Sequence, residues 1–262
     1  MKVIRAVNIE NSTISVSSEN PLYDFDTALN DSRLSRYGKT VDVNDEWIKF
    51  TYAAAIDVDV VGIFENNFMP GATVKIQANA TDVWISPSID QALTYTKDNK
   101  ASVDLGRDVG VWSYQFSSTE SYKYWRLSVD DPTNPDGFIK IGFIFTDESL
   151  DMPGMSVNQT FPIVSNSTVM FSTSGQAYGL KKLQINTASF NFPVITTAQK
   201  KEMEVFYYNT DLINPYMILV WENSLDVQRP LYAVTTKLPE FYRVEVSGGV
   251  AWTCSKEIRE VK

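Results

Sequence analysis

Apolar and polar side chains alternate along residues 122–130 and again along residues 139–145. A two-residue period is typical of half-buried β-strands, so we expect two antiparallel strands that pair as a hairpin. The connection between them, residues 131–137, reads DPTNPDG. Because its prolines lack an N–H for a strand ladder and its Asp-Gly step favours positive φ, this segment is predicted to form a corner that makes contacts.

The same period recurs through the first half of the chain, with turn residues between the alternating segments. A spacing of roughly ten to twelve residues between such segments is typical of a β-sandwich. The region between residues 11 and 31 is polar with two aromatic anchors, which fits a loop or a short helical turn. The further strands predicted in this half are residues 1–9, 47–52, 56–64, 72–78 and 109–116.

A domain boundary is predicted at residues 147–154, where charged residues, Pro and Gly occur together. We therefore expect an all-β protein with a sandwich over residues 1–148 and a second, β-rich domain over residues 149–262. The second domain should contain one packed helix at about 197–210, because Thr196 and Gln199 form a capping box and Asn214-Pro215 is a stop signal. Its predicted strands are residues 157–171, 179–192, 217–221, 231–236 and 241–247.

Charge is distributed unevenly along the 262 residues. The net charge is 23 − 32 = −9, with 13 Lys/Arg against 22 Asp/Glu in residues 1–150 and 10 against 10 in residues 151–262. An acidic chain without a basic cluster is not expected to bind nucleic acid, which requires neutralised phosphates, or an anionic membrane. No apolar stretch is long enough to span a bilayer, and the N-terminal residues do not read as a secretory signal.

The chain has no histidine and one cysteine, Cys254. This composition excludes His-based catalytic triads, His-ligated zinc, an internal disulfide and a multi-cysteine zinc site. Cys254 is expected to be a buried, inert thiol. The oxygen-bearing residues Asp130, Asp131, Asn134 and Asp136 leave a calcium loop open as an alternative, but they are also ordinary turn residues. We expect no metal and no cofactor.

The strand order around "WIKFTY", "IDVDVVGIFENNF", "VGVWSYQF" and "YKYWRLSVDD" resembles the galactose-binding-like, discoidin-type jelly roll. The resemblance covers about residues 20–148. In that family an aromatic-Trp-Arg strand, here residues 124–126, is followed by a closing strand, here residues 139–145. The resemblance implies a jelly-roll sandwich.

A narrower resemblance combines "YWR", "DDPTNPDG" and "IKIGFIF" with a second β domain that contains a strand-helix-strand unit. In this the chain looks like virion structural proteins of tailed bacteriophages, in particular minor tail or tail-tip components. The resemblance implies a non-enzymatic subunit in the tail tip or baseplate region of the virion. Its partners would be other virion proteins and copies of itself.

The alternative function is a carbohydrate-binding module that recognises a cell-surface glycan. Sugar binding needs aromatic faces beside polar groups, and Arg36, Tyr37 and Trp84 are the candidates for glycan contact. A role of the tryptophan in the core or in an interface is the competing interpretation. A glycosidase with two carboxylates would not require histidine, but no spacing of acidic residues identifies such a pair, and no G-x-S-x-G motif occurs. We therefore expect no enzymatic activity.

Overall fold

The protein is described from a computed structural model. The structure describes residues 2–5, 11–30, 36–97, 110–152, 163–165, 168–171, 173–174, 177–180, 184–210, 216–222, 227–246 and 249–260. These residues fall into two compact units. The sandwich unit contains Lys2–Leu150 and Met217–Pro230, and the second unit contains Asp151–Tyr216 and Leu231–Lys262. The expected boundary at 148/149 stays a prediction, since residues 217–230 group with the first part of the chain.

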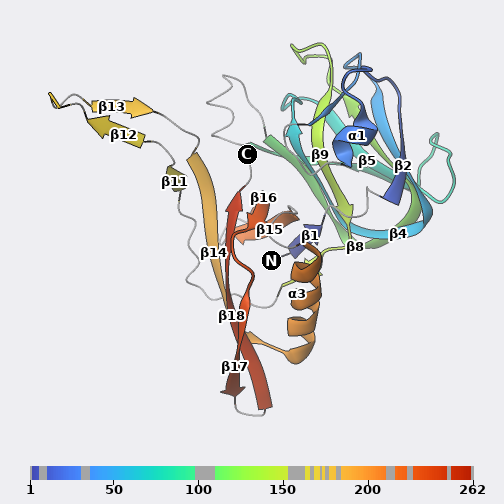
Figure 1. The fold of residues 1–262 in the computed structure, drawn as a ribbon. Coiled ribbons are helices and arrows are strands. Elements are labelled where there is room, and N and C mark those ends of the chain that lie inside the picture. The colour runs from blue at the N-terminus through green and yellow to red at the C-terminus, as the bar shows by residue number, and fades with distance from the viewer. Residues whose placement is uncertain are drawn as a thin grey trace. The chain divides into compact units, whose positions relative to one another are not determined.

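Two long strands organise the sandwich unit, β4 (Glu46–Asn66) and β8 (Gly110–Asp130), each of 21 residues. They pair antiparallel, and their register shifts between Thr51 and Ile56 and again between Val58 and Val60. A straight strand of this length would extend about 70 Å. Figure 1 shows both strands curving, so that their two halves contribute to different layers.

Each layer follows from the strand pairing. In one layer, the first half of β4 pairs with β2 (Ser12–Val16) on one side and with the second half of β8 on the other. The second half of β8 also pairs with β5 (Thr73–Asn79), and β5 pairs with β6 (Ile89–Ala92). The second half of β4 pairs with the first half of β8 and with β9 (Lys140–Asp147). This layer is completed by β3 (Gly38–Lys39) beside β9 and β7 (Thr94–Lys97) beside β8. The arrangement is a jelly-roll β-sandwich, as predicted.

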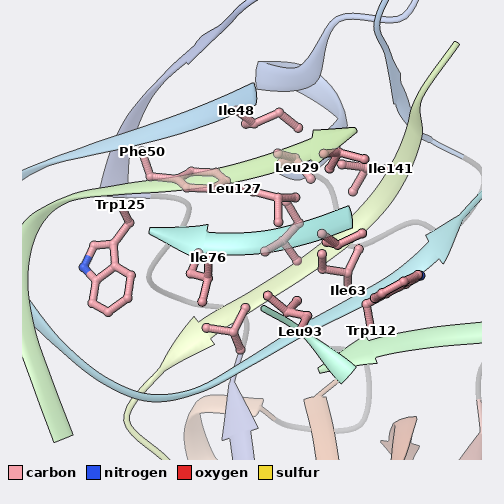
Figure 2. Packing of buried hydrophobic residues seen from close by; sticks show 14 of the residues in the cluster. Leu29, Ile48, Phe50, Ile63, Ile76, Leu93, Trp112, Trp125, Leu127 and Ile141 are labelled. Carbon is pink, nitrogen blue, oxygen red and sulfur yellow. The ribbon is translucent and has the colours of Figure 1, made fainter. Parts of the chain in front are cut away.

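The core lies between these two layers (Figure 2). Alternate residues of β4 and β8 point inward, as the two-residue period of a strand requires. One layer contributes Phe50, Trp125 and Ile76, and the other contributes Ile63 and Trp112. The helix α1 (Phe25–Leu29) covers part of the core with its buried residues.

The predicted hairpin of residues 122–145 is wrong. In the sheet order β9, β4, β8, strand β4 lies between the two strands, so β8 and β9 do not pair. Residues 47–52 and 56–64, predicted as separate strands, belong to the single strand β4. Likewise, residues 109–116 and 122–130 contribute to one continuous strand, β8. The first strand, β1 (Lys2–Arg5), lies outside the sandwich layers, next to β10 (Leu150–Asp151) and β15 (Tyr216–Glu222).

The second unit is mostly β with one long helix. Its strands include β14 (Gln184–Ile195) and β18 (Gly249–Glu260), which pair with each other. The sheet is extended by β11 (Ile163–Ser165), by β17 (Glu240–Val246) and by residues 231–235 at the end of β16 (Val227–Thr235). β12 (Thr168–Phe171) and β13 (Ala177–Leu180) form a separate pair. Residues 157–162 and the predicted stop at 214–215 lie outside the described residues.

The helix α3 (Thr197–Thr210) begins at the predicted capping box. The N–H of Gln199 donates to the Thr196 hydroxyl at 3.2 Å, and the N–H of Thr196 donates to the Gln199 side chain at 3.0 Å. Two N–H groups at the helix start are thus satisfied reciprocally. The buried residues Met203, Phe206 and Tyr207 give α3 an apolar face, as their helical spacing predicts.

Lys256 of β18 is 1% exposed, and its ammonium group faces aromatic rings. Its Nζ lies 3.9 Å from the ring centroid of Tyr207 and 4.3 Å from that of Tyr216, and it donates a hydrogen bond to the Tyr207 hydroxyl. Burial lowers the pKa of Lys256 well below its usual value, and it raises the pKa of the nearby Cys254 thiol to about 11. Cys254 is therefore buried and held as a thiol, as expected.

Candidate functional site

The segment 131–137 passes from one layer of the sandwich to the other, because β8 ends in one layer and β9 begins in the other. Asp131 at its start is fully buried. One carboxylate oxygen, Oδ2, accepts the N–H of Met69 at 2.9 Å and the side-chain amide of Asn134 at 3.0 Å. The other oxygen, Oδ1, has no hydrogen-bond partner among the described residues. The predicted corner is confirmed, and it binds the loop that follows β4.

Asn67 in that loop completes the network. Its Nδ2 donates to Asp136 Oδ2 and to the carbonyl of Phe138, both at 2.9 Å, and its Oδ1 accepts the N–H of Lys140 at 2.7 Å. Asn67 is 2% exposed, so these bonds are shielded from water. The corner network of Asn67, Asp131, Asn134 and Asp136 therefore fixes the backbone that carries Phe138 and Lys140.

The calcium alternative places ligands on the same carboxylates. In the structure, Asp131 Oδ2 and Asp136 Oδ2 already accept hydrogen bonds from nitrogen donors. Among the described residues, no group of three or more His, Cys, Asp or Glu side chains is arranged to hold a metal ion. The observed role of these carboxylates is to hold the corner.

The corner network lies beside a cluster of aromatic rings and lysines. We define the aromatic–lysine cluster as Tyr23, Tyr37, Lys39, Phe138 and Lys140. The rings of Tyr23 and Tyr37 stack in parallel, with centroids 5.3 Å apart and an interplanar angle of 8°. Tyr23 is 36% exposed, and the other four side chains are partly buried. The pKa of Tyr37 is raised, first by burial and then by the neighbouring Tyr23.

Two ammonium groups lie on these rings. Lys39 Nζ is 4.1 Å from the centroid of Tyr23, 4.2 Å from that of Phe138 and 5.3 Å from that of Tyr37. Lys140 Nζ is 4.4 Å from the centroid of Tyr37. A cation over an aromatic face is attracted by the ring quadrupole, which orders both side chains.

The backbone around the cluster is fixed by short-range contacts. The N–H of Lys39 donates to the carbonyl of Tyr23 at 2.9 Å. A Cβ at Gly38 would lie 2.2 Å from the ring of Phe25, so α1 can pack here only against glycine. Asp24 caps α1 by accepting the N–H groups of Asp26 and Thr27. These contacts place Tyr23 and Lys39 side by side.

Of the three residues predicted from the sequence, Tyr37 belongs to the aromatic–lysine cluster and Arg36 precedes it as an exposed side chain. Trp84 lies elsewhere. Its ring is 4.4 Å from the guanidinium of Arg126, and its Nε1 donates to Asp82 Oδ1 at 2.7 Å. Arg126 alternates with buried neighbours on β8, so Trp84 covers the outer face of the layer opposite to that of β3 and β9. The structure does not bring Trp84 together with the other two residues.

Four members of the cluster were not predicted: Tyr23, Lys39, Phe138 and Lys140. Lys39 and Lys140 are about 100 residues apart in sequence and meet only because β3 pairs with β9. From the sequence, Tyr23 is predicted only as one of the two aromatic anchors of the polar region between residues 11 and 31. No local pattern links these positions, and only the strand pairing reveals the cluster.

Solved structures of carbohydrate-binding proteins are similar to this chain. One is a family 32 carbohydrate-binding module of NanJ from C. perfringens, solved with galactose, at a TM-score of 0.40 and 15% identity over 55% of this chain and 97% of the module. Another is a family 32 module from Clostridium perfringens, solved with GalNAc-β-1,3-galactose, at 0.40 and 9% over 56% and 99%. A third is chitosan-binding module 1 of a Paenibacillus sp. IK-5 chitosanase/glucanase, at 0.38 and 16% over 53% and 96%.

No protein-family model and no curated protein matches the sequence. Nothing in these comparisons points to a tail protein of a bacteriophage. In the part of the chain that the structure describes, no helix is both long enough and apolar enough to cross a membrane.

Proposed function

We propose that the sandwich unit is a carbohydrate-binding module whose binding surface is the aromatic–lysine cluster. The observation that carries the proposal is the stacked pair of Tyr23 and Tyr37, held by lysines at the surface of the sandwich. Sugar rings present C–H faces that pack on flat aromatic side chains, while their hydroxyl groups need polar partners. The cluster offers both, since ammonium groups donate hydrogen bonds and tyrosine hydroxyls donate or accept them.

The cluster is also rigid before any ligand arrives. A backbone hydrogen bond connects Tyr23 with Lys39, and the corner network holds Phe138 and Lys140. A pre-organised surface loses less conformational entropy when it binds, which favours affinity. In this proposal the protein binds sugar without transforming it.

Trp84 fits a structural role better than a sugar contact. Its N–H is already bonded to Asp82, and Arg126 lies against its ring. The loop between β5 and β6 is thereby fastened to the sheet. Substitutions of Trp84 can therefore be compared with substitutions in the aromatic–lysine cluster, since only the latter should affect sugar binding.

A second candidate function is assembly with other subunits, as in a virion tail. It is supported by apolar side chains that the second unit exposes: Val205 is 60%, Tyr208 88% and Tyr242 57% exposed. Tyrosine is enriched in the cores of protein interfaces. The mass of the full chain in solution, measured by light scattering, tests this role. A stable oligomer that becomes monomeric in Tyr208→Ser supports assembly, and a monomer at all concentrations contradicts self-assembly.

The test of sugar binding uses the full chain and a panel of neutral and acidic oligosaccharides on a glycan array, followed by calorimetry. Tyr23→Ala should abolish binding, because it removes the more exposed ring of the stack. Tyr124→Ala is the matched control, since Lys123 lies over the Tyr124 ring at 5.6 Å in a similar pair elsewhere on the sandwich. Absence of binding to every saccharide, or equal loss in both variants, would contradict the proposed function.

A further inference from the structure

Lys39 and Lys140 are direct partners across the antiparallel pair of β3 and β9. Like charges at directly opposite positions destabilise a sheet. The neighbouring aromatic rings reduce this cost, because each ammonium group is attracted by a ring face. The arrangement nevertheless concentrates two positive charges at one point of the surface.

The ammonium group of Lys39 keeps its hydrogen-bonding capacity. Within the described part of the chain, its Nζ has contacts with the three rings, and no carboxylate or other acceptor lies within hydrogen-bond distance. An ammonium group carries three N–H donors. A ring face attracts the charge but does not accept these hydrogen bonds in the way that an oxygen atom does. These donors are left for water or for a ligand.

The surroundings make this concentration of positive charge unusual. Residues 1–150 have a net charge of 13 − 22 = −9. Two other lysines of the sandwich differ from Lys39 in having acidic partners, since Lys49 lies 2.7 Å from Asp82 and Lys75 lies 3.0 Å from Asp90. The acidic unit as a whole therefore repels an anionic ligand, whereas the aromatic–lysine cluster attracts it. An anionic ligand would for this reason bind at the cluster and not elsewhere on the unit.

We propose that the ligand of the aromatic–lysine cluster is an acidic saccharide, one whose sugar ring carries a carboxylate. This inference rests on the proposed sugar-binding function and specifies its ligand class. The sugar ring packs on Tyr23, and its carboxylate accepts hydrogen bonds from Lys39. A hydrogen bond between an ammonium group and a carboxylate is shorter and stronger than one between neutral groups, so the carboxylate adds selectivity to the stacking.

The experiment measures the affinity of the full chain for oligogalacturonate and for a neutral galactan oligosaccharide of the same length. Wild type should bind the acidic oligomer at least about tenfold more tightly, and this preference should decrease as salt is raised. Lys39→Met should remove the preference for the acidic oligomer. The variant should still bind the neutral oligomer, with the lower affinity that the wild type has for it. Lys123→Met, the matched control, removes the same charge beside another tyrosine and should leave the preference unchanged.

The outcomes separate the two proposals. Equal affinity for both oligomers, with no effect of Lys39→Met, contradicts the acidic ligand and leaves sugar binding in place. A loss of preference in Lys123→Met as large as in Lys39→Met also contradicts it, because the effect would then come from overall charge. Failure of the wild type to bind either oligomer or any member of the saccharide panel contradicts both proposals. Circular dichroism of each variant confirms that the fold is retained.

Discussion

Lys39 and Lys140 face each other across β3 and β9 and share the ring of Tyr37, at 5.3 and 4.4 Å from its centroid. Asn67 fixes the same strand pair, because its Oδ1 accepts the backbone N–H of Lys140 in β9. A charged surface feature and a buried polar network are thus joined through one short pair of strands. This relationship connects the stability of the corner with the geometry of the proposed binding surface.

Asn67→Ala should destabilise the sandwich. The substitution removes three hydrogen bonds of a buried side chain, to Asp136, Phe138 and Lys140. At about 1 kcal/mol for each bond, the expected loss is roughly 2–4 kcal/mol, measured by urea denaturation. Asn44→Ala removes an exposed amide and should change stability by less than about 0.5 kcal/mol. Similar effects of the two substitutions would contradict the importance of the corner network.

Calcium should not bind tightly to the segment 131–137. The oxygens of Asp131 and Asp136 that face the corner are already acceptors for Asn67, Met69 and Asn134. Isothermal titration calorimetry of the full chain with calcium chloride should therefore show no high-affinity site. Tight binding that disappears in Asp136→Ala would overturn this interpretation.

Lys256→Met should stabilise the protein near neutral pH. Because burial lowers the native pKa of Lys256, the unfolded chain binds a proton that the native state does not, so stability rises with pH between the native and unfolded values. Over pH 6–7.5, below the ordinary thiol pKa of about 8.5 at which Cys254 titrates in the unfolded chain, this one group contributes a slope of up to about 1.4 kcal/mol per pH unit. Urea denaturation across that range should show a flatter dependence in Lys256→Met. An unchanged slope, or the same change in the exposed control Lys237→Met, would contradict the prediction.

Trp84→Ala should cost stability without abolishing sugar binding. The change removes the ring contact with Arg126 and the hydrogen bond to Asp82, together about 1–3 kcal/mol. Thermal denaturation measures the loss, and calorimetry at a temperature where the variant is folded measures binding. A stable variant that no longer binds sugar would move the binding site to Trp84.

The alternation along residues 122–130 and 139–145 predicted both strands correctly. In β8 the period reflects burial of one face, whereas six consecutive residues of β9 are buried, so both of its faces are covered. It did not predict their partners. β4 inserts between them from a distant part of the sequence, and such pairing depends on how the layers pack. The turn chemistry of 131–137 predicted the corner, but its main partner, Asn67, lies more than 60 residues away.

The candidate site was predictable only in part. Tyr37 could be selected because a tyrosine beside an arginine in a polar loop suits a binding surface. Tyr23, Lys39, Phe138 and Lys140 could not, since cross-strand and loop contacts bring them together. Trp84 was selected by residue type alone, and its surroundings indicate a structural role.

If the stacked tyrosine pair is the sugar-binding surface of the sandwich, loss of Tyr23 must abolish binding. Calorimetric titration of oligosaccharide into wild type, Tyr23→Ala and Trp84→Phe compares the two candidate positions. Tyr23→Ala should lose binding and Trp84→Phe should retain it. Retained binding in Tyr23→Ala together with its loss in a folded Trp84→Phe would exclude the tyrosine pair as the binding surface.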